Sequence, residues 1–147
     1  MRLLDQWQIN YSPHAYDASL TDGMSIAKTL GEDPDTVFKT LVTVANTNEH
    51  FVFVIPVQAS LNLKKAATAA GVKWVEMIKQ KELLPLTGYI HGGCSPIGMK
   101  KPFRTFIEET ASLLDRMLVS AGRVGFQIEV APSDLLTSSD ANYADLT

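Results

Sequence analysis

The stretch from Thr87 to Gly98 has the residue types best suited to holding an anion or an ester. Four glycines, at positions 88, 92, 93 and 98, fall within eleven residues, and Pro96 lies among them. Glycine lets backbone amides approach a ligand closely, and amides that point one way bind an anion or a developing oxyanion. The alternative is a turn-rich loop that binds nothing. The spacing matches neither Gly-x-Gly-x-x-Gly nor a phosphate loop, so the usual nucleotide fingerprints are absent.

Lys39 is the second candidate, because it interrupts the apolar sequence Val-Phe-Lys-Thr-Leu-Val at positions 37–42. Side chains of a strand alternate between two faces. This lysine therefore either reaches out to water along its aliphatic stem, or points into a polar cavity. In a cavity its ammonium would bind a carbonyl or phosphate oxygen.

Other nucleophiles and bases lack the partners that their chemistry needs. His91 adjoins the glycines and is a candidate general base, which requires a proton donor within hydrogen-bond reach. Cys94 would need a histidine partner to act as a nucleophile, and we expect it to pack instead. Neither Ser95 nor Ser120 has the Gly-x-Ser-x-Gly setting of a hydrolase elbow. The three histidines and single cysteine show no metal-ligand spacing.

The charge is divided along the chain, although the formal net charge is only −3. Residues 60–104 contain eight basic and two acidic side chains, and the segments on either side are both acidic. Such a basic segment is either a solvated lysine-rich face or a contact surface for phosphates. In the second case its affinity would fall steeply with salt.

These candidates need a scaffold, and the hydrophobic pattern predicts strands interspersed with helices. We expect strands at 37–45 and 51–57 to form a hairpin in the middle of a sheet, with 51–57 buried on both faces. Asn62 and Gly71 predict the ends of a helix at 63–70. The remaining helical expectations are helices at 3–7, 22–30 and 79–84 and helical turns at 110–114 and 133–136. We also expect an extended segment at 14–18, strands at 73–77, 104–108, 117–120 and 126–131, and a mobile tail.

The 147 residues and 16.1 kDa suit one domain, residues 1–147, of mixed α/β (α+β) class around a curved sheet with helices outside it. The longest apolar run has seven residues, far short of the roughly 20 that a spanning helix needs, so we expect no membrane association. The N-terminal residues do not resemble a secretory signal. With a single cysteine, the composition favours a reducing, cytoplasmic location.

Several of these segments, taken in order, resemble a known family. Val-Phe-Lys-Thr-Leu at 37–41, Leu-Asn-Leu-Lys-Lys-Ala at 61–66, the glycine stretch, and Ser-Ala-Gly-Arg-Val-Gly at 120–125 followed by Gln-Ile-Glu-Val are similar to the YbaK/EbsC branch of the prolyl-tRNA editing-domain family. The match runs from about Asn10 to Leu136. The resemblance implies a barrel-like mixed sheet of six or seven strands and an aminoacyl-tRNA deacylase that acts in trans. The implied substrate is Cys-tRNA(Pro), with some activity on Cys-tRNA(Cys).

The resemblance also assigns roles to residues. Lys39 matches the functional lysine of the family, Tyr16 its site tyrosine, and Gln127 stands where the best-known branch has an aspartate. The implied substrate-binding residues are Gly92, Gly93, Ser95, Pro96, Gly98 and Ser120. The lysines expected to contact tRNA phosphates are Lys64, Lys65, Lys100 and Lys101. No cofactor and no metal are implied, and prolyl-tRNA synthetase is the partner that would select the tRNA.

The chain lacks a convincing nucleophile of its own, and the family's solution is the thiol of the cysteinyl substrate. That thiol attacks its own ester carbonyl and cyclises, while the protein orients the ester and stabilises the oxyanion. Holding thiol and carbonyl together makes the step intramolecular, with effective molarities of roughly 10⁵–10⁸ M. Two alternatives stay open: a tRNA- or synthetase-binding module without catalysis, and a hydrolase of another substrate that uses His91 or Cys94.

Overall fold

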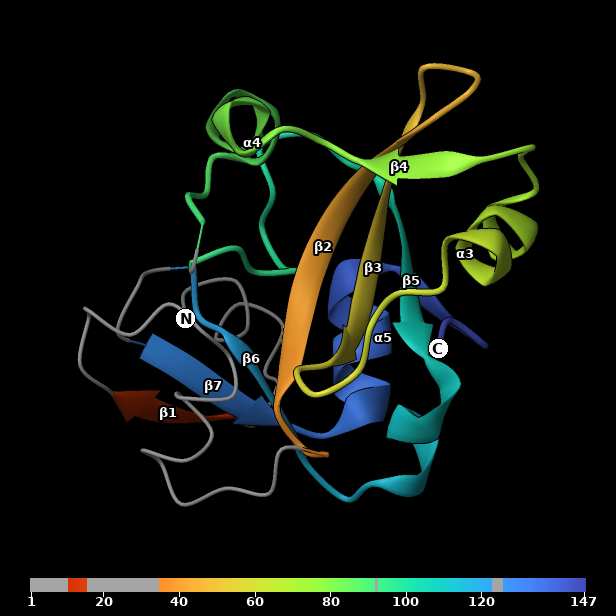
Figure 1. Ribbon diagram of the computed structural model, residues 1–147. Helices are drawn as coiled ribbons and strands as arrows, with labels where there is room; N and C mark the ends of the chain where they lie inside the picture. Colours follow the sequence, from red (N-terminus) through yellow and green to blue (C-terminus); the bar gives the residue numbers. More distant parts are fainter. Residues whose placement is uncertain (1–10, 16–34, 92, 123–125) are drawn as a thin grey trace.

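A computed structural model describes residues 11–15, 35–91, 93–122 and 126–147 (Figure 1). The chain alternates strands with short helices in these ranges. The elements are β1 (Tyr11–Ala15), β2 (Phe38–Ala45), β3 (His50–Pro56), α3 (Leu63–Ala70), β4 (Val75–Met77), α4 (Gln80–Thr87), β5 (Arg104–Glu108), the 3₁₀ helix η1 (Glu109–Leu113), β6 (Met117–Ser120), β7 (Phe126–Val130), α5 (Pro132–Ser139) and β8 (Ala141–Ala144). The helices expected at 3–7 and 22–30 lie outside the described residues, as do positions 16–18 of the expected extended segment.

The strands form two sheets, which confirms the mixed α/β class. The larger sheet has the order β4-β2-β3-β5-β8 and the smaller the order β1-β7-β6. A parallel bridge between Val37 and Leu118 joins β2 to β6, and the Leu118 N–H donates to the Thr36 carbonyl over 2.8 Å. Neither sheet closes into a barrel among the described residues, so the barrel-like closure that the resemblance implied is not confirmed.

The central hairpin forms as predicted from the two apolar segments. Antiparallel pairing of β2 with β3 runs from Phe38↔Pro56 to Val44↔His50. Asn48 takes the left-handed conformation in the turn, with φ 68°, which asparagine tolerates better than most residues. Residues 51–57 are all buried because β3 has strands on both sides and packed side chains on both faces.

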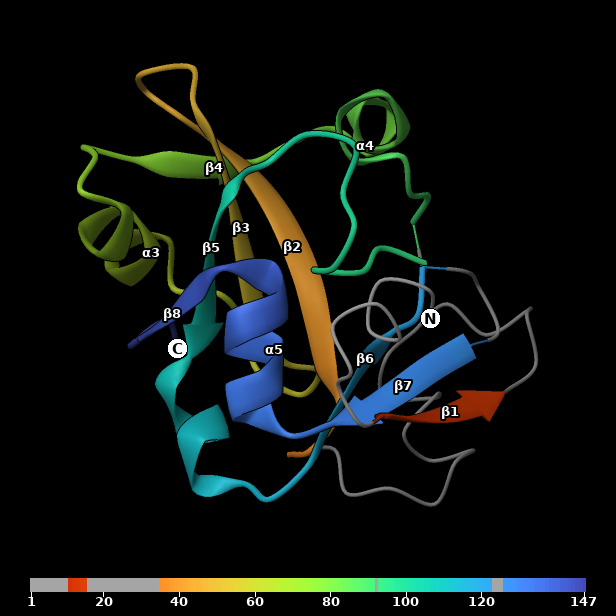
Figure 2. The same ribbon diagram turned by 180° about the vertical axis from the view of Figure 1, so that it is seen from behind.

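Helices cover opposite faces of the larger sheet (Figures 1 and 2). On one face the alanines of α3 pack against Phe51, Phe53 and Phe106. On the other face Leu135 of α5 packs with side chains from both sheets, so this second core ties the sheets together. No helix within the described ranges combines the length and apolar character needed to cross a bilayer.

Local signals explain where α3 and α4 end. The Asn62 side chain accepts from the N–H groups of Lys64 and Lys65, and Gly71 ends α3 with φ 75°, as predicted. The helix expected at 79–84, with its stop near Pro85, is present as α4, but it runs past the proline to Thr87. A proline removes one backbone hydrogen bond from the helix, yet α4 continues to Thr87. Gly88 then ends the helix in the left-handed conformation, with φ 83°, which glycine adopts at less cost than other residues.

The C-terminal region is more ordered than the sequence suggested. The helical turn expected at 133–136 is a helix of eight residues, α5, which has Pro132 at its first position. The tail is not mobile: β8 pairs in parallel with β5, and Leu146 is fully buried. The Leu146 N–H donates to the carboxylate of Glu108 over 2.9 Å, and the Leu146 carbonyl accepts from the Asn62 N–H. Pairing with a distant strand leaves little trace in a four-residue sequence, so the sequence alone did not indicate this order.

Candidate functional site

Lys39 and Ser120 share one face where the two sheets meet. Each lies two residues beyond a member of the bridged pair Val37 and Leu118. Because alternate residues of a strand point the same way, Lys39 follows Val37 and Ser120 follows Leu118. Those two apolar side chains pack against each other, so the polar pair above them faces the same side.

Gln127 extends this face by one strand. It is paired with Ser120 across β6 and β7, and directly opposed residues project from the same face. Ser120 and Gln127 are 7% and 5% exposed. The Ser120 Oγ accepts from the Gly122 N–H over 3.2 Å, whereas the Gln127 Oε1 is buried and has no hydrogen-bond partner among the residues that the structure describes. A buried acceptor without a partner is costly, which makes this oxygen a candidate acceptor for a ligand donor.

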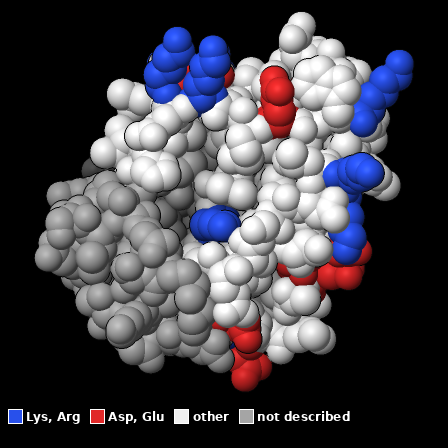
Figure 3. All heavy atoms as spheres, viewed as in Figure 1, with Lys and Arg blue, Asp and Glu red and all other residues white. Residues whose placement is uncertain are grey.

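The ammonium of Lys39 faces the same side, and no described residue holds it in a hydrogen bond or an ion pair. The side chain is half-buried, and among the described residues no carboxylate lies within ion-pair distance of it. In the space-filling view a basic side chain lies in a hollow of the face that presents β2, apart from the basic groups at the rim (Figure 3). Lys39 is the only basic residue of β2. We call Lys39, Ser120 and Gln127 the polar triad.

The opposite face of the same strands is core. Phe38, Val119 and Ile128 are neighbours of the triad residues in sequence and point to the other side, where they pack together with Ile97. All four are nearly inaccessible. The alternation expected for β2 is therefore confirmed. Lys39 projects from the face opposite Phe38, and that face is itself apolar on either side of it, at Val37 and Leu41.

The glycine stretch begins against the triad. A side chain at Gly122, which has φ 97°, would place its Cβ only 2.8 Å from the Cε1 atom of Tyr89. The Tyr89 hydroxyl donates to the Ile97 carbonyl and so ties the start of the stretch to its end. Since Gly122 also binds Ser120, the ring of Tyr89 lies next to the triad. Nothing in the sequence around Tyr89 marks it as a site residue, and the one signal that could have done so is Gly122, the glycine opposite its ring.

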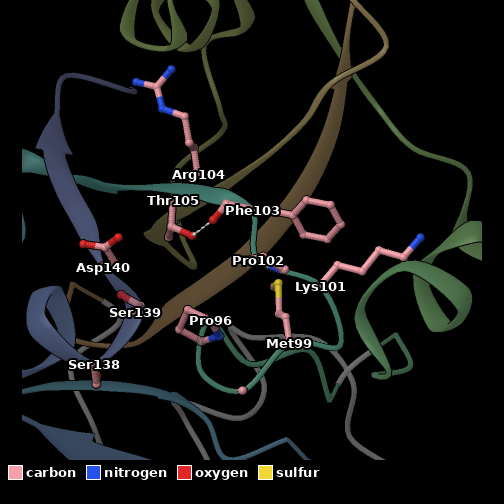
Figure 4. A pocket seen from close by; sticks show the side chains of 11 residues that line it. Pro96, Met99, Lys101, Pro102, Phe103, Arg104, Thr105, Ser138, Ser139 and Asp140 are labelled. Carbon is pink, nitrogen blue, oxygen red and sulfur yellow. Dashed lines mark hydrogen bonds between the residues drawn. The ribbon is translucent and has the colours of Figure 1, made fainter.

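The second half of the stretch turns to the other face. Pro96 and Gly98 line a cavity of about 350 Å³, together with Thr105 of β5 and Ser138 and Ser139 at the end of α5 (Figure 4). Ser95 is fully buried, and its Oγ accepts from the Ile97 N–H, so its hydroxyl serves the loop itself. Gly93 is buried between the two halves. Gly92 and Tyr16 lie outside the described residues.

Cys94 packs, as expected. Its side chain lies in a cluster with Val42 and Val52. Burial raises the pKa of its thiol to about 12, partly offset by a hydrogen bond with the Thr87 side chain. A thiol with such a pKa is protonated near neutral pH and is a poor nucleophile. His91 is exposed at the surface.

The four lysines predicted to bind phosphates lie in two separate places. Lys64 and Lys65 belong to α3, and the Lys65 ammonium pairs with Asp145 over 3.1 Å. Lys100 and Lys101 precede β5, and the Lys100 N–H donates to the Thr87 carbonyl at the end of α4. Within the described part of the chain, no three His, Cys, Asp or Glu side chains are grouped as metal ligands would be.

Comparison with known proteins gives this geometry a context. The sequence model of the aminoacyl-tRNA editing domain matches residues 21–137. A relative from Enterococcus faecalis, assigned as a candidate Cys-tRNA(Pro)/Cys-tRNA(Cys) deacylase and named EbsC, is 44% identical over 149 residues, which cover 100% of this chain and 91% of the relative.

Solved structures have the same fold at lower identity. A candidate trans-editing enzyme for prolyl-tRNA synthetase superposes with a TM-score of 0.84 at 23% identity, over 93% of this chain and 86% of that one. A hypothetical protein gives a TM-score of 0.91 at 21% identity, over 99% of this chain and 96% of that one. At these identities the likeness concerns the fold alone.

Proposed function

The chain belongs to the aminoacyl-tRNA editing-domain family, and from that premise we propose that it is a deacylase that acts in trans on mischarged tRNA. The proposed substrate is Cys-tRNA(Pro), with Cys-tRNA(Cys) as the second. The observation that carries the proposal is the polar triad. In the described part of the chain, the half-buried Lys39 has no fixed partner, and it shares a face with a buried amide oxygen that accepts no hydrogen bond there. Such a face suits an ester that brings its own donors and an electron-rich carbonyl.

In the proposed mechanism Lys39 binds the ester carbonyl oxygen and stabilises the negative charge that develops on it. Removing one donor of this kind from an oxyanion site commonly costs about 10²–10³ in rate. The Gln127 Oε1 accepts from the α-ammonium group of the aminoacyl moiety, which gives this buried oxygen a partner. Its neutral amide replaces the carboxylate found in the best-known branch, so binding here relies on a hydrogen bond rather than on an ion pair.

The nucleophile is the thiol of the substrate. The sulfur attacks the ester carbonyl, a C–S bond forms, the bond from the carbonyl carbon to the ribose oxygen breaks, and the thiol proton ends on that oxygen. The products are a cysteine thiolactone, which water then opens, and a free tRNA 3′ end. This route needs no base or nucleophile from the protein, in keeping with the raised pKa of the Cys94 thiol.

The test is release of the amino acid from Cys-tRNA(Pro), compared with S-methyl-cysteinyl-tRNA(Pro). We expect release from the first, almost none from the second, and a loss of about 10²-fold in Lys39→Ala. Equal release from both substrates would reject the cyclisation while keeping a deacylase. No release above buffer would reject the activity itself.

A binding module without catalysis is the second candidate, favoured by the neutral Gln127 and by the concentration of basic residues between positions 60 and 104. Tight, salt-sensitive tRNA binding without any release would support it. The same binding measurement, repeated with prolyl-tRNA synthetase present, tests whether the synthetase is the partner that selects the tRNA.

A further inference from the structure

Four lysines gather at the two ends of α4, and we call this surface the α4 edge. Lys79 precedes the helix and Lys81 lies in its first turn, while Lys100 and Lys101 lie beside its last turn. A Cβ on Gly88 would be 3.6 Å from the Cβ of Lys100, so the two segments are in contact. Basic side chains gather over α4 (Figure 3), and Lys101 runs away from the cavity toward the side of this helix (Figure 4).

The positive charge of the α4 edge is only partly offset, by Glu82 in the first turn of α4. All four lysines are exposed, and among the described residues none of them is within ion-pair distance of a carboxylate. By contrast, one of the two lysines of α3 is paired with Asp145. A lysine that neutralises a phosphate releases a counterion condensed on the nucleic acid. A lysine already paired with a carboxylate must give up that partner first, which favours the α4 edge over α3 as the polyanion site.

Direct contacts connect the α4 edge to the polar triad. The Thr87 hydroxyl accepts from the Tyr89 N–H over 3.0 Å. The Tyr89 ring faces Gly122, and the Gly122 N–H donates to Ser120. A chain that lies on the α4 edge therefore has a short path to the triad, along the start of the glycine stretch.

Exposed apolar side chains border this path. Leu84 of α4 is 52% exposed, and Ile90 at the start of the glycine stretch is 54% exposed. Aliphatic groups gain nothing from phosphates, but they bury apolar surface when they pack against the face of an unpaired base. Basic groups followed by apolar groups suit a nucleic acid that changes from duplex to single strand as it nears the triad.

We propose that the α4 edge, rather than α3, carries the acceptor arm of the tRNA, with its unpaired 3′ bases over Leu84 and Ile90. This inference rests on the proposed function, since it takes a tRNA 3′ end as the occupant. It adds Lys79 and Lys81 to the lysines expected to contact phosphates and removes Lys64 and Lys65 from them.

The test measures binding of uncharged tRNA over a series of salt concentrations. We expect the double variant K79E/K81E to bind about 10-fold more weakly and to reduce the salt slope by about two, one for each phosphate that the variant no longer neutralises. The charge-matched variant K73E/R116E should stay within about twofold of wild type. A loss as large in K64E/K65E as in K79E/K81E would overturn the proposal, and so would an unchanged slope in K79E/K81E.

The position of the 3′ end is tested with Ile90→Ser and with tRNA that lacks its last three nucleotides. We expect Ile90→Ser to weaken binding of intact tRNA about fivefold and not to change binding of the shortened tRNA. Leu113→Ser, on η1, is the control, because Leu113 is also exposed and lies away from α4. An equal loss with both tRNAs would reject the placement of the bases.

These results separate the inference from the proposed function. If the wild type deacylates but the α3 and α4 variants lose tRNA affinity equally, the proposed function is kept and the placement of the acceptor arm on the α4 edge is rejected. If there is no deacylation but the salt slope falls in K79E/K81E and not in K64E/K65E, the catalysis is rejected and the placement of the tRNA on the α4 edge is kept.

Discussion

Two buried polar side chains, Gln127 and Glu108, differ in how their oxygens are satisfied. Both are nearly inaccessible, at 5% and 2% exposure. Glu108 accepts from the N–H groups of Leu146 and Thr110, at 2.9 and 3.0 Å, and so fastens the C-terminal segment to β5. The Gln127 Oε1 accepts no hydrogen bond from any described residue. The satisfied group stabilises the fold, whereas a buried oxygen without a partner costs stability, and it is this oxygen that we propose binds a ligand.

The largest effect on the ligand side is expected from the ammonium of Lys39. Lys39→Met keeps most of the aliphatic stem and removes the charge, so we expect deacylation of Cys-tRNA(Pro) to fall about 10²-fold. The free energy of unfolding in urea should change by less than about 1 kcal/mol, because this lysine has no ion pair with any of the described residues. Lys73→Met on the α3–β4 connection is the control. A large loss of stability in Lys39→Met would show that Lys39 stabilises the fold, as Glu108 does.

The next effect belongs to Glu108. Burial alone would raise its pKa, but hydrogen bonds from Leu146, Thr110 and Thr147 together lower the pKa below its ordinary value of 4.5. A lowered pKa stabilises the fold above about pH 4.5, and this contribution is lost as pH falls through the folded-state pKa. We expect Glu108→Gln to lose about 1.5–3 kcal/mol at pH 7 and to resemble wild type at acidic pH.

Thermal unfolding between pH 3 and 7 measures this difference. The activity of folded Glu108→Gln should stay near wild type, because Glu108 fastens the tail and is not part of the triad. A gap in stability that stays constant across this pH range would show that the carboxylate charge has no part in the effect.

A smaller effect of opposite sign is expected at Gln127. Gln127→Met removes the buried unpaired oxygen at similar volume, so we expect stability to rise by about 1 kcal/mol. Deacylation should fall about 10-fold, because the substrate loses one hydrogen bond. Urea unfolding and the KM for Cys-tRNA(Pro) measure the two changes. Lower stability in this variant would contradict the proposal that the Gln127 Oε1 has no partner in the free protein and gains one from the substrate.

The smallest effect is expected at Cys94, a buried group that belongs to neither class. Cys94→Ala should keep deacylation within about twofold, since a thiol with a pKa of about 12 supplies no nucleophile near neutral pH. The native protein should also resist alkylation by iodoacetamide at pH 8. Rapid alkylation with loss of activity would restore the hypothesis of a cysteine hydrolase.

Local signals made the core of the fold predictable. The apolar run at 51–57, the cap at Asn62 and the stop at Gly71 each depend on nearby residues, and the structure agrees with all three. The pairing of β8 with β5 depends on residues more than thirty positions apart. No periodicity in four residues could reveal it, and the sequence therefore predicts a mobile tail where the structure has a strand.

The candidate site was only half predictable for a similar reason. Strand alternation allowed Lys39 to face either side, and only the bridge to Leu118 shows which side it shares with Ser120 and Gln127. The sequence predicts one anion-binding loop from the glycine stretch. In the structure the first half of this stretch lies next to the triad, and its second half lines the cavity behind the sheet. This separation depends on the folded chain and could not be predicted from the sequence.

The contact between Tyr89 and Gly122 has an evolutionary consequence. Any side chain at position 122 meets the tyrosine ring and also strains a backbone with φ 97°. Replacing the tyrosine by a smaller residue relieves the clash but not the strain, so the order of substitutions matters. The two positions are therefore expected to show epistasis. A substitution at Gly122 is tolerated only after Tyr89 has been replaced by a smaller residue.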